Sequence, residues 1–382
     1  MIVTGEASGD LHGANLINAC KELSPQTSFF GVGGRKMAAA GCDILIPGEE
    51  ISVMGIVEVF GHFPVIWRAF QRLKKELHGP RKPDALVLID FPEFNLRLAR
   101  QAHKAGIPVL YYVSPQVWAW RQGRVKKIAA IVDSLAAIFP FEPELYEGHD
   151  IRVRYVGHPL LDEFAMVAGR IDLREKLKLP AAAKLVGLFP GSRRNELRYM
   201  LATLVATARL IHAREPEVHF LVPIAASLTT DEVRSQFPAN LPVTFFEAGT
   251  ATIYDIAGSC DTILSVSGTV TLQIALAGTP MAILYKLSPL SYAIGKRLVR
   301  VDHIGLPNIV AGTRVVPEFV QEMATPQALA DEALHVLSDV NYARAMQDGL
   351  RTVQARLGAP GCARRVAKML FDMIQRRQAA QK

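Results

Sequence analysis

The stretch DTILSVSGTVTLQIALAGTPMAILYK, residues 261–286, decides the fold class. Residues 262–266 are rich in β-branched side chains, which is typical of a buried strand. The Ser-Gly-Thr turn 267–269 follows, a helix is predicted from Val270, and a Gly-Thr-Pro turn leads into a second strand. This succession of strand, helix and strand predicts a parallel α/β sheet.

The turn at Ser267, Gly268 and Thr269 has the features of an anion site. Small residues let a ligand approach the backbone, and the first N–H groups of a helix have no partner within it. Such a turn is more often only a cap for the helix. Its interpretation as a phosphate site therefore depends on the rest of the chain.

A second turn of this kind opens the chain at IVTGEASGD, residues 2–10. The next residues place Leu16, Cys20 and Leu23 on one face of a predicted helix. The turn lacks the complete G-x-G-x-x-G spacing, and no acidic residue follows at the distance that a ribose requires. A nicotinamide-dinucleotide site is therefore disfavoured.

A further unit places an acidic residue at a strand end. The sequence predicts a strand over Ala85–Ile89, a loop over Asp90–Glu93, a helix over Phe94–Lys104 and a strand over Val109–Val113. Asp90 would then follow the carboxyl end of its strand, the edge that lines the ligand crevice in open α/β sheets.

A second α/β series begins near Lys184. A predicted strand over Leu185–Phe189 leads into the turn PGSRRNE, which contains Ser192 and Arg193. Further strands are predicted over His219–Pro223 and Val243–Phe245. We therefore expect an N-terminal domain over 1–162, a second domain over 163–340 and a helical segment over 341–382.

Length and composition agree with a two-domain globular protein of 382 residues, 50% hydrophobic and 21% charged. No apolar run is long enough to cross a bilayer. The opening residues do not have the basic-then-apolar pattern of a secretory leader, and the four cysteines form no C-x-x-C pair, so a reducing cytoplasm is expected. No His, Cys and carboxylate cluster has metal-ligand spacing.

The net charge of +7 indicates an anionic partner or solvated basic helix faces. Basic runs occur at 121–127, at 296–300 and in the tail from Arg364. Nucleic acid is disfavoured as the partner, because the sequence has no zinc finger, RNA-binding signature or basic repeat.

Nine motifs span nearly the whole chain in this order: GEASGDLHGA, VMGIVEV, IDFPEFN, YYVSPQVWAWR, FPFE, VGHPL, FPGSR, SGTVTLQ and LPNIVAG. Together they closely resemble the lipid-A-disaccharide synthases. The resemblance implies a GT-B fold, in which two Rossmann-like domains with parallel sheets face each other across a cleft. It also implies an inverting glycosyltransferase that uses neither metal nor cofactor.

The reaction implied by the resemblance joins UDP-2,3-diacylglucosamine to 2,3-diacylglucosamine 1-phosphate, giving a β-1,6-linked disaccharide and UDP. The implied location is the cytoplasmic face of the inner membrane, as a peripheral protein. A homodimer with exchanged C-terminal segments is a further implication, and the basic helical tail from Ala363 to Arg377 is compatible with it.

This chemistry requires a base for the acceptor hydroxyl and positive charge for the departing diphosphate. Asp90 is the candidate base; the alternative is a loop residue that caps the following helix. Glu93 is a weaker candidate, because an acidic residue in a first helical turn commonly interacts with the helix dipole.

No Asp-x-Asp pair is present to hold a metal, so the protein itself would stabilise the diphosphate. Arg193 can offer a planar fork to it, with Ser192 and the Gly268–Thr269 backbone beside it. The alternative for Arg193 is a surface ion pair with Glu196.

The resemblance implies that Ser8, Gly9 and Asn308 contact the nucleotide. It also places Gln273 where similar sequences usually carry a Glu that binds the ribose hydroxyls. A Gln accepts only a neutral hydrogen bond, which is weaker than the charge-assisted bond of a carboxylate. The substitution therefore puts nucleotide affinity in doubt, and leaves the reaction type unaffected.

An apolar segment before the basic run 72–75 is the candidate surface for acyl chains and membrane. Its candidate residues are Val53, Met54, Phe63, Val65, Ile66, Trp67 and Phe70. The alternative is an ordinary core helix. Trp118 and Trp120, with the basic residues after them, form a second aromatic and basic cluster that could equally belong to the core.

Two other functions share some of these features. Another GT-B enzyme, such as a lipid-linked N-acetylglucosaminyltransferase or a UDP-sugar 2-epimerase, would have the same domains and phosphate turns. A non-catalytic protein that binds nucleotide sugars or anionic lipids would need the pocket and the apolar surface, but would not need Asp90.

Overall fold

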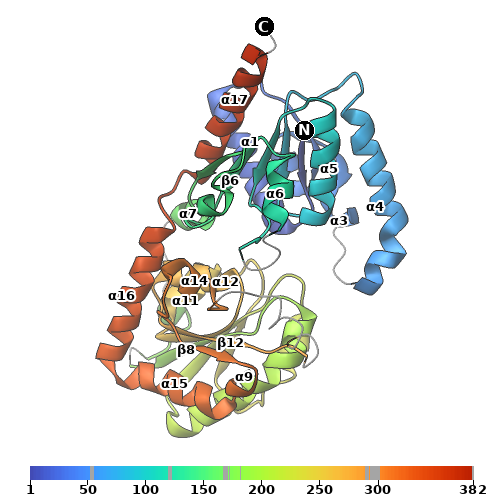
Figure 1. The fold of residues 1–382 in the computed structure, drawn as a ribbon. Coiled ribbons are helices and arrows are strands. Elements are labelled where there is room, and N and C mark those ends of the chain that lie inside the picture. Colours follow the sequence, from blue (N-terminus) through green and yellow to red (C-terminus); the bar gives the residue numbers. More distant parts are fainter. Residues whose placement is uncertain are drawn as a thin grey trace. The chain divides into compact units, whose positions relative to one another are not determined.

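The computed structural model describes residues 1–51, 56–118, 123–166, 171, 173–180, 182–288, 292 and 302–380. The chain forms two compact units (Figure 1). Unit 1 comprises Met1–Asp162 and Gly358–Lys382, and unit 2 comprises Glu163–Leu357. Each unit is an α/β domain with its own parallel sheet and its own hydrophobic core.

The sheet of unit 1 has seven strands in the order β3-β2-β1-β4-β5-β6-β7. All neighbouring strands run parallel. The central strands are almost completely buried, as expected for a sheet covered on both faces. The strands are β1 (Ile2–Thr4), β2 (Phe29–Gly33), β3 (Cys42–Pro47), β4 (Leu86–Ile89), β5 (Val109–Tyr112), β6 (Ser134–Ala137) and β7 (Arg152–Tyr155).

The helices of unit 1 include the last one of the chain, α17, which packs along α1 (Figure 1). The carboxylate of Asp162 accepts hydrogen bonds from the N–H groups at the start of α17, including that of Ala363 at 3.1 Å. The helices are α1 (Ala7–Leu23), α2 (Arg35–Ala39), α3 (Gly48–Ile51), α4 (Ile56–Glu76), α5 (Pro92–Lys104), α6 (Arg124–Ala129), η1 (Pro143–Tyr146) and α17 (Cys362–Ala380), and α7 (Leu160–Met166) leads into unit 2.

The sheet of unit 2 has six parallel strands in the order β10-β9-β8-β11-β12-β13. The strands are β8 (Lys184–Phe189), β9 (Val218–Pro223), β10 (Val243–Phe246), β11 (Thr262–Val266), β12 (Met281–Tyr285) and β13 (Glu318–Val320). The stretch that opened the sequence analysis thus forms β11, a helix and β12, as predicted.

The helices of unit 2 include α16, which packs on α12 and α14. The helices are α8 (Leu173–Lys176), α9 (Arg194–Arg214), α10 (Thr230–Arg234), α11 (Ile253–Ser259), α12 (Val270–Ala277), α14 (Leu306–Ala311), η2 (Gln321–Met323), α15 (Pro326–Ser338) and α16 (Val340–Arg356). None of the described helices of either unit combines the length and the apolar character needed to cross a bilayer.

One local prediction needs correction. Helix α5 begins at Pro92 and not at Phe94, because proline is well suited to the first helical position. The helix predicted over Leu16, Cys20 and Leu23 is α1; Leu16 and Cys20 are buried, and Leu23, the last residue of the helix, is 38% exposed.

In each sheet the strand order reverses at one place. In unit 1 this switch point lies between β1 and β4, where Thr4 pairs with Ile89. In unit 2 it lies between β8 and β11, where Phe189 pairs with Ser265. Ligands of open α/β sheets bind beyond the carboxyl strand ends at such points. The turns that follow these four strands are therefore where a site is expected.

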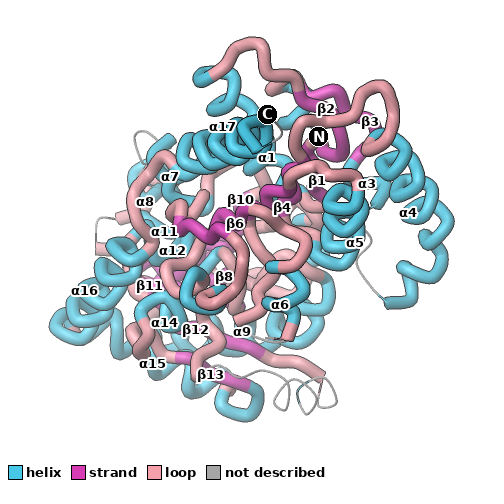
Figure 2. The backbone as a smooth tube through the Cα atoms, turned by 45° about the horizontal axis from the view of Figure 1, so that its top comes forward, coloured by secondary structure: helices cyan, strands magenta, loops and turns pink. Residues whose placement is uncertain are grey.

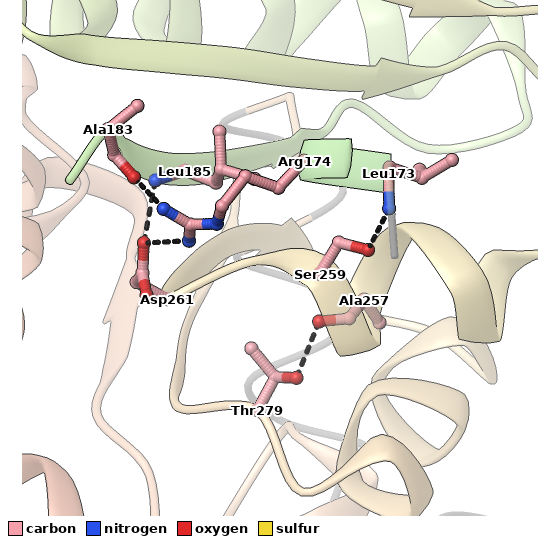
Figure 3. A network of polar contacts seen from close by, with 8 residues as sticks. All are labelled: Leu173, Arg174, Ala183, Leu185, Ala257, Ser259, Asp261 and Thr279. Atoms are coloured by element: carbon pink, nitrogen blue, oxygen red, sulfur yellow. Dashed lines mark hydrogen bonds and ion pairs between the residues drawn. The ribbon is translucent and has the colours of Figure 1, made fainter. Parts of the chain in front are cut away.

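At the other end of the strands of unit 2, the amino end, polar groups bond to neighbouring groups of the same unit (Figure 3). Asp261 accepts hydrogen bonds from the Leu185 N–H at 2.7 Å and from Arg174 at 3.2 Å. The Thr279 hydroxyl donates to the Ala257 carbonyl at 2.6 Å. Because these groups bond to one another at the amino strand ends, their role is to hold the sheet and its helices together.

Candidate active site

The turn after β1 places Ser8 and Gly9 in the first helical turn of α1. Ser8 is exposed, whereas Gly9 is buried. A Cβ atom on Gly9 would lie 1.8 Å from the Thr4 Oγ1, and one on Gly5 would lie 2.8 Å from the Phe91 ring. Both positions therefore require glycine, because α1 begins directly against β1 and against the turn after β4.

Asp10, the last acidic residue of this motif, has a structural role that the sequence did not reveal. Its carboxylate accepts hydrogen bonds from the N–H groups of Gly34 at 2.7 Å, Lys36 at 3.0 Å and Met37 at 3.1 Å. It thus binds the beginning of α2.

Asp90 lies directly after β4 at the switch point of unit 1, beside the turn that carries Ser8 and Gly9. The N-cap residue of α5 is Phe91, so the capping alternative for Asp90 is wrong. Burial raises the pKa of the Asp90 carboxyl to about 6, and the nearby Glu6 raises it further. A carboxyl group with this pKa is mostly ionised at neutral pH and can accept a proton there.

Glu93 lies in the first turn of α5 and forms an ion pair with Arg124. Its side chain is 67% exposed. This agrees with its interpretation as a surface residue near the helix dipole.

The turn after β8 is shaped by Gly191, whose φ of +99° favours glycine. The carboxylate of Glu196 accepts hydrogen bonds from the N–H groups of Ser192 at 2.9 Å and Arg193 at 3.2 Å. Arg193 is the N-cap residue of α9. Its guanidinium lies 3.7 Å from Glu196, so the surface ion pair is present, but the side chain is 66% exposed. Such a pair is weak and leaves the guanidinium accessible to a ligand.

The turn after β11 divides into a bonded part and an accessible part. Ser267 is fixed within unit 2, because its N–H donates to Leu284 O at 3.2 Å and its hydroxyl to Ile304 O at 3.1 Å. A Cβ atom on Gly268 would meet no atom within 4 Å. Thr269 is the exposed N-cap residue of α12. The N–H groups of Thr271 and Leu272 bond to Gly268 O and Thr269 O at 3.0 Å, so the N–H groups before them are the ones that an anion can use. Gly268 and Thr269 thus fit the predicted anion site better than the Ser267 side chain does.

Asn308 is completely buried in α14, and its side chain is fully bonded within unit 2. Its amide N–H groups donate to Val316 O at 2.9 Å and to Glu318 at 2.7 Å, and its oxygen accepts from the N–H groups of Val315 and Val316. A direct nucleotide contact would have to displace one of these bonds. The geometry therefore favours a positioning role for Asn308.

Glu318 was not identified from the sequence. Its carboxylate also accepts from the N–H groups of Ile304 at 2.9 Å and Gly305 at 2.8 Å. Since Ile304 O accepts the Ser267 hydroxyl, Glu318 and Asn308 together hold the segment that lies against the turn after β11.

Gln273 lies one helical turn into α12 and is partly buried. Its amide nitrogen donates to the carboxylate of Glu163 at 3.4 Å. This neighbour was not foreseen, and it means that a Glu at position 273 would face a second carboxylate.

The predicted apolar segment is only partly described, since Val53, Met54 and the side chain of Phe63 lie outside the described residues. Helix α4 packs beside α5 (Figure 2). Ile66 and Phe70 pack against the core of unit 1, and Val65 is half-buried. Trp67 is 53% exposed. The expectation that Val65 and Ile66 form an exposed surface is therefore wrong, and among the described side chains of this group Trp67 is the exposed one.

Trp118 belongs to the core, because it is buried and packs edge-on against Phe139 and Phe141. Trp120 lies outside the described residues. Nearby, the buried carboxyl of Glu142 accepts from the Phe139 N–H at 3.0 Å and from the Ser114 hydroxyl at 3.1 Å. Glu142 thus joins the YYVSPQVWAWR and FPFE motifs. Burial raises its pKa to about 7.

Comparison with known proteins agrees with these motifs. The family model described as lipid-A-disaccharide synthetase matches residues 1–369. The lipid-A-disaccharide synthase of Syntrophotalea carbinolica is 60% identical over 376 residues, which cover 98% of this chain and 95% of that protein. The enzyme of Geobacter sulfurreducens is 47% identical, with 98% and 97% covered. The chain belongs to the lipid-A-disaccharide synthase family. It is therefore a glycosyltransferase of lipid A biosynthesis.

Solved structures show the same fold at low sequence identity. The UDP complex of Staphylococcus aureus MnaA has a TM-score of 0.67 at 11% identity and covers 98% of this chain and 95% of that one. The glycosyltransferase of kitacinnamycin has a TM-score of 0.61 at 15% identity, with 97% and 98% covered. This member of the lipid-A-disaccharide synthase family, with its two parallel sheets, has a GT-B fold.

Proposed function

We propose that the protein transfers the 2,3-diacylglucosaminyl group of UDP-2,3-diacylglucosamine to the 6-hydroxyl of 2,3-diacylglucosamine 1-phosphate. The hydroxyl oxygen forms a bond to the anomeric carbon, the bond from this carbon to the diphosphate oxygen breaks, and the configuration inverts. The hydroxyl proton passes to Asp90, and UDP leaves.

The observation that carries this proposal is the Asp90 carboxyl, which lies at the switch point of unit 1 and is not needed as a helix cap. Its pKa of about 6 is close to the working pH, which is where a general base is most effective. The departing diphosphate would be stabilised by Arg193, by the N–H groups at Gly268 and Thr269, and by the N-terminus of α12.

Incubation with both substrates, followed by mass analysis, tests the proposal. The expected product is the disaccharide 1-phosphate, formed in equal amount to UDP. Conversion of the UDP-sugar in the absence of acceptor would indicate a 2-epimerase. Binding of both compounds without turnover would indicate a non-catalytic protein. Either result would contradict the proposal.

The nucleotide site is proposed to include Ser8, Gly9, Ser192, Ser267 and Gln273, with Asn308 as a positioning residue. Exchanging the two side chains, in the double variant Gln273→Glu with Glu163→Gln, moves the carboxylate from position 163 to position 273 and should strengthen UDP binding about fivefold. A carboxylate forms a stronger hydrogen bond to ribose than an amide does, by about 1 kcal/mol. Isothermal titration calorimetry with UDP measures the change.

The single variant Gln273→Glu is the control, since it leaves the carboxylate of Glu163 beside the new one. We expect it to gain less affinity than the double variant, because like charges repel. Unchanged UDP affinity in the double variant would show that residue 273 does not contact the ribose.

We also propose that the protein is peripheral on the cytoplasmic face of the inner membrane and that α4 contacts the bilayer. Trp67→Ala should reduce partition onto vesicles of phosphatidylglycerol and phosphatidylethanolamine by roughly tenfold or more, since a large buried apolar side chain contributes about 1.5–3 kcal/mol. Its melting temperature should hardly change, because Trp67 is exposed.

Two variants serve as controls for this prediction. Met323→Ala removes another exposed apolar side chain, in unit 2, and should leave partition unchanged. Ile66→Ser should lower the melting temperature, because Ile66 packs on the core. Equal partition of Trp67→Ala and the unaltered protein would contradict a bilayer contact at this position.

The exchange of C-terminal segments in a homodimer also stays a prediction, which light scattering and crosslinking test.

A further inference from the structure

Two successive residues at the candidate base have an unusual backbone conformation. Asp90 has a φ of +48° and Phe91 a φ of +49°, and neither is glycine. Each such residue costs about 1–3 kcal/mol and persists only where its surroundings enforce it. The structure around Asp90 must therefore supply the contacts that hold this turn.

Two buried side chains supply these contacts. The amide nitrogen of Asn95 donates to Asp90 O at 2.7 Å and to Ile89 O at 3.2 Å. The hydroxyl of Tyr111 donates to the same Asp90 O at 2.7 Å. Asn95 and Tyr111 are both completely buried. Bonds of this kind are strong at low local dielectric, and the loss of either donor would remove one of the two side-chain hydrogen bonds to Asp90 O.

The fold brings the two donors to the same carbonyl from different elements. Asn95 lies in the first part of α5, which begins immediately after the turn. Tyr111 lies in β5, where it pairs with Leu88 of β4. Helix and neighbouring strand thus hold the turn between them, and the Asp90 N–H adds a bond to Tyr112 O at 3.2 Å.

The number of available protons limits what these side chains can do. Tyr111 has one hydroxyl proton, and Asn95 has two amide protons; all three are used on backbone oxygens of residues 89 and 90. No proton is left for the Asp90 carboxylate. Neither side chain therefore donates a hydrogen bond to the carboxylate itself, and both bond to the backbone that carries it.

We propose that Asn95 and Tyr111 are positioning residues that hold Asp90 in the left-handed conformation required for proton transfer. The inference rests on the proposed role of Asp90 as the general base. It adds two residues to which neither the motifs nor the family resemblance gave a role.

Tyr111→Phe is the sharpest test, because it removes one hydroxyl and keeps the ring in the core. We expect kcat to fall about 3- to 10-fold, the equivalent of one hydrogen bond, with KM and UDP affinity unchanged. Asn95→Leu removes two bonds and should lower kcat further. Tyr112→Phe is the matched control: Tyr112 is the next residue of β5, is equally buried, and its hydroxyl lies 3.3 Å from Cys362 Sγ. It should leave kcat unchanged.

A double-mutant cycle with Asp90→Asn separates positioning from general structural damage. If Tyr111 acts through Asp90, Tyr111→Phe should reduce turnover in the unaltered protein and have no further effect in Asp90→Asn. An equal loss in both backgrounds, an equal loss in Tyr112→Phe, or full activity of Tyr111→Phe would overturn the inference. If Asp90→Asn itself keeps turnover within a few-fold, the proposed base is wrong, which is a different result from failure of the positioning residues alone.

Discussion

Asp90→Asn should lower turnover by on the order of 100-fold or more while leaving UDP affinity nearly unchanged. The amide has the shape of the carboxylate but cannot accept the acceptor's hydroxyl proton. The backbone bonds from Asn95 and Tyr111 go to the carbonyl of residue 90, so they survive the substitution. Steady-state kinetics and calorimetry on the same preparation measure the two quantities. Turnover within a few-fold of the unaltered protein would contradict the assignment of Asp90 as the base and leave Glu93 as the candidate.

The same assignment predicts a pH dependence. The base must be ionised, and burial together with Glu6 raises the pKa of Asp90 to about 6. The kcat/KM value should therefore fall as the pH is lowered through about 6, and Asp90→Asn should lose this limb of the profile. Glu93→Gln is the control and should retain it, because Glu93 is exposed and paired with Arg124.

Stability should change in the opposite direction from activity. A folded-state pKa above the usual value of 3.8 means that the folded protein binds the proton more tightly than the unfolded chain. The contribution of Asp90 to the free energy of unfolding is therefore lost as the pH rises from about 4 to above 6. At neutral pH the ionised, buried Asp90 disfavours the folded state, so Asp90→Asn should not lower the melting temperature there, and a large decrease would indicate general damage.

Local sequence features were sufficient to predict the elements that carry the site. The run from β11 through α12 to β12 combines β-branched residues, a turn of small residues and a glycine after the helix, each of which acts over a few neighbouring positions. The position of Asp90 followed directly from the end of β4. Because each turn follows directly after a predicted strand, its place at the carboxyl end of that strand could also be predicted.

Two of the contacts that hold these turns in place could not be predicted, because each joins side chains or backbone of different elements of the fold. Tyr111 bonds to a carbonyl 21 residues away, and Glu318 bonds to Asn308 across 10 residues. The first contact depends on the pairing of β4 with β5 and the second on how α14 packs beside β13, and local patterns contain neither. The resemblance implied a nucleotide contact for Asn308 but gave no indication that its hydrogen bonds are already filled.

The sequence also did not show which apolar residues of α4 are exposed. Phe63, Ile66, Trp67 and Phe70 follow the i, i+3, i+4, i+7 spacing of one helix face, and Val65 lies off that face. The spacing does not show which edge of this face is buried. Only the packing against α5 and the core shows that Ile66 is turned inward while Trp67 remains exposed.

Arg193→Ala should lower kcat/KM by on the order of 100-fold or more, with a smaller loss of UDP affinity. The departing diphosphate gains negative charge in the transition state, and a planar guanidinium can bind two of its oxygens at once. Arg193 stands at the start of α9, next to the switch point of unit 2. Its ion pair with Glu196 is long, at 3.7 Å, and exposed to solvent, so little is lost when the guanidinium turns to a ligand.

Arg194→Ala is the matched control for this variant. Arg194 is the next residue, carries the same charge, is 77% exposed and pairs with Glu232 at 3.1 Å. A general effect of positive charge on an anionic substrate would reduce kcat/KM similarly in both variants, whereas a specific contact affects Arg193 alone. Arg193→Lys should recover only part of the loss, because an ammonium group cannot form the two parallel bonds of a guanidinium. Since the proposal assigns the diphosphate charge to protein groups, a chelator should leave turnover unchanged, and a strict requirement for Mg²⁺ would contradict this assignment.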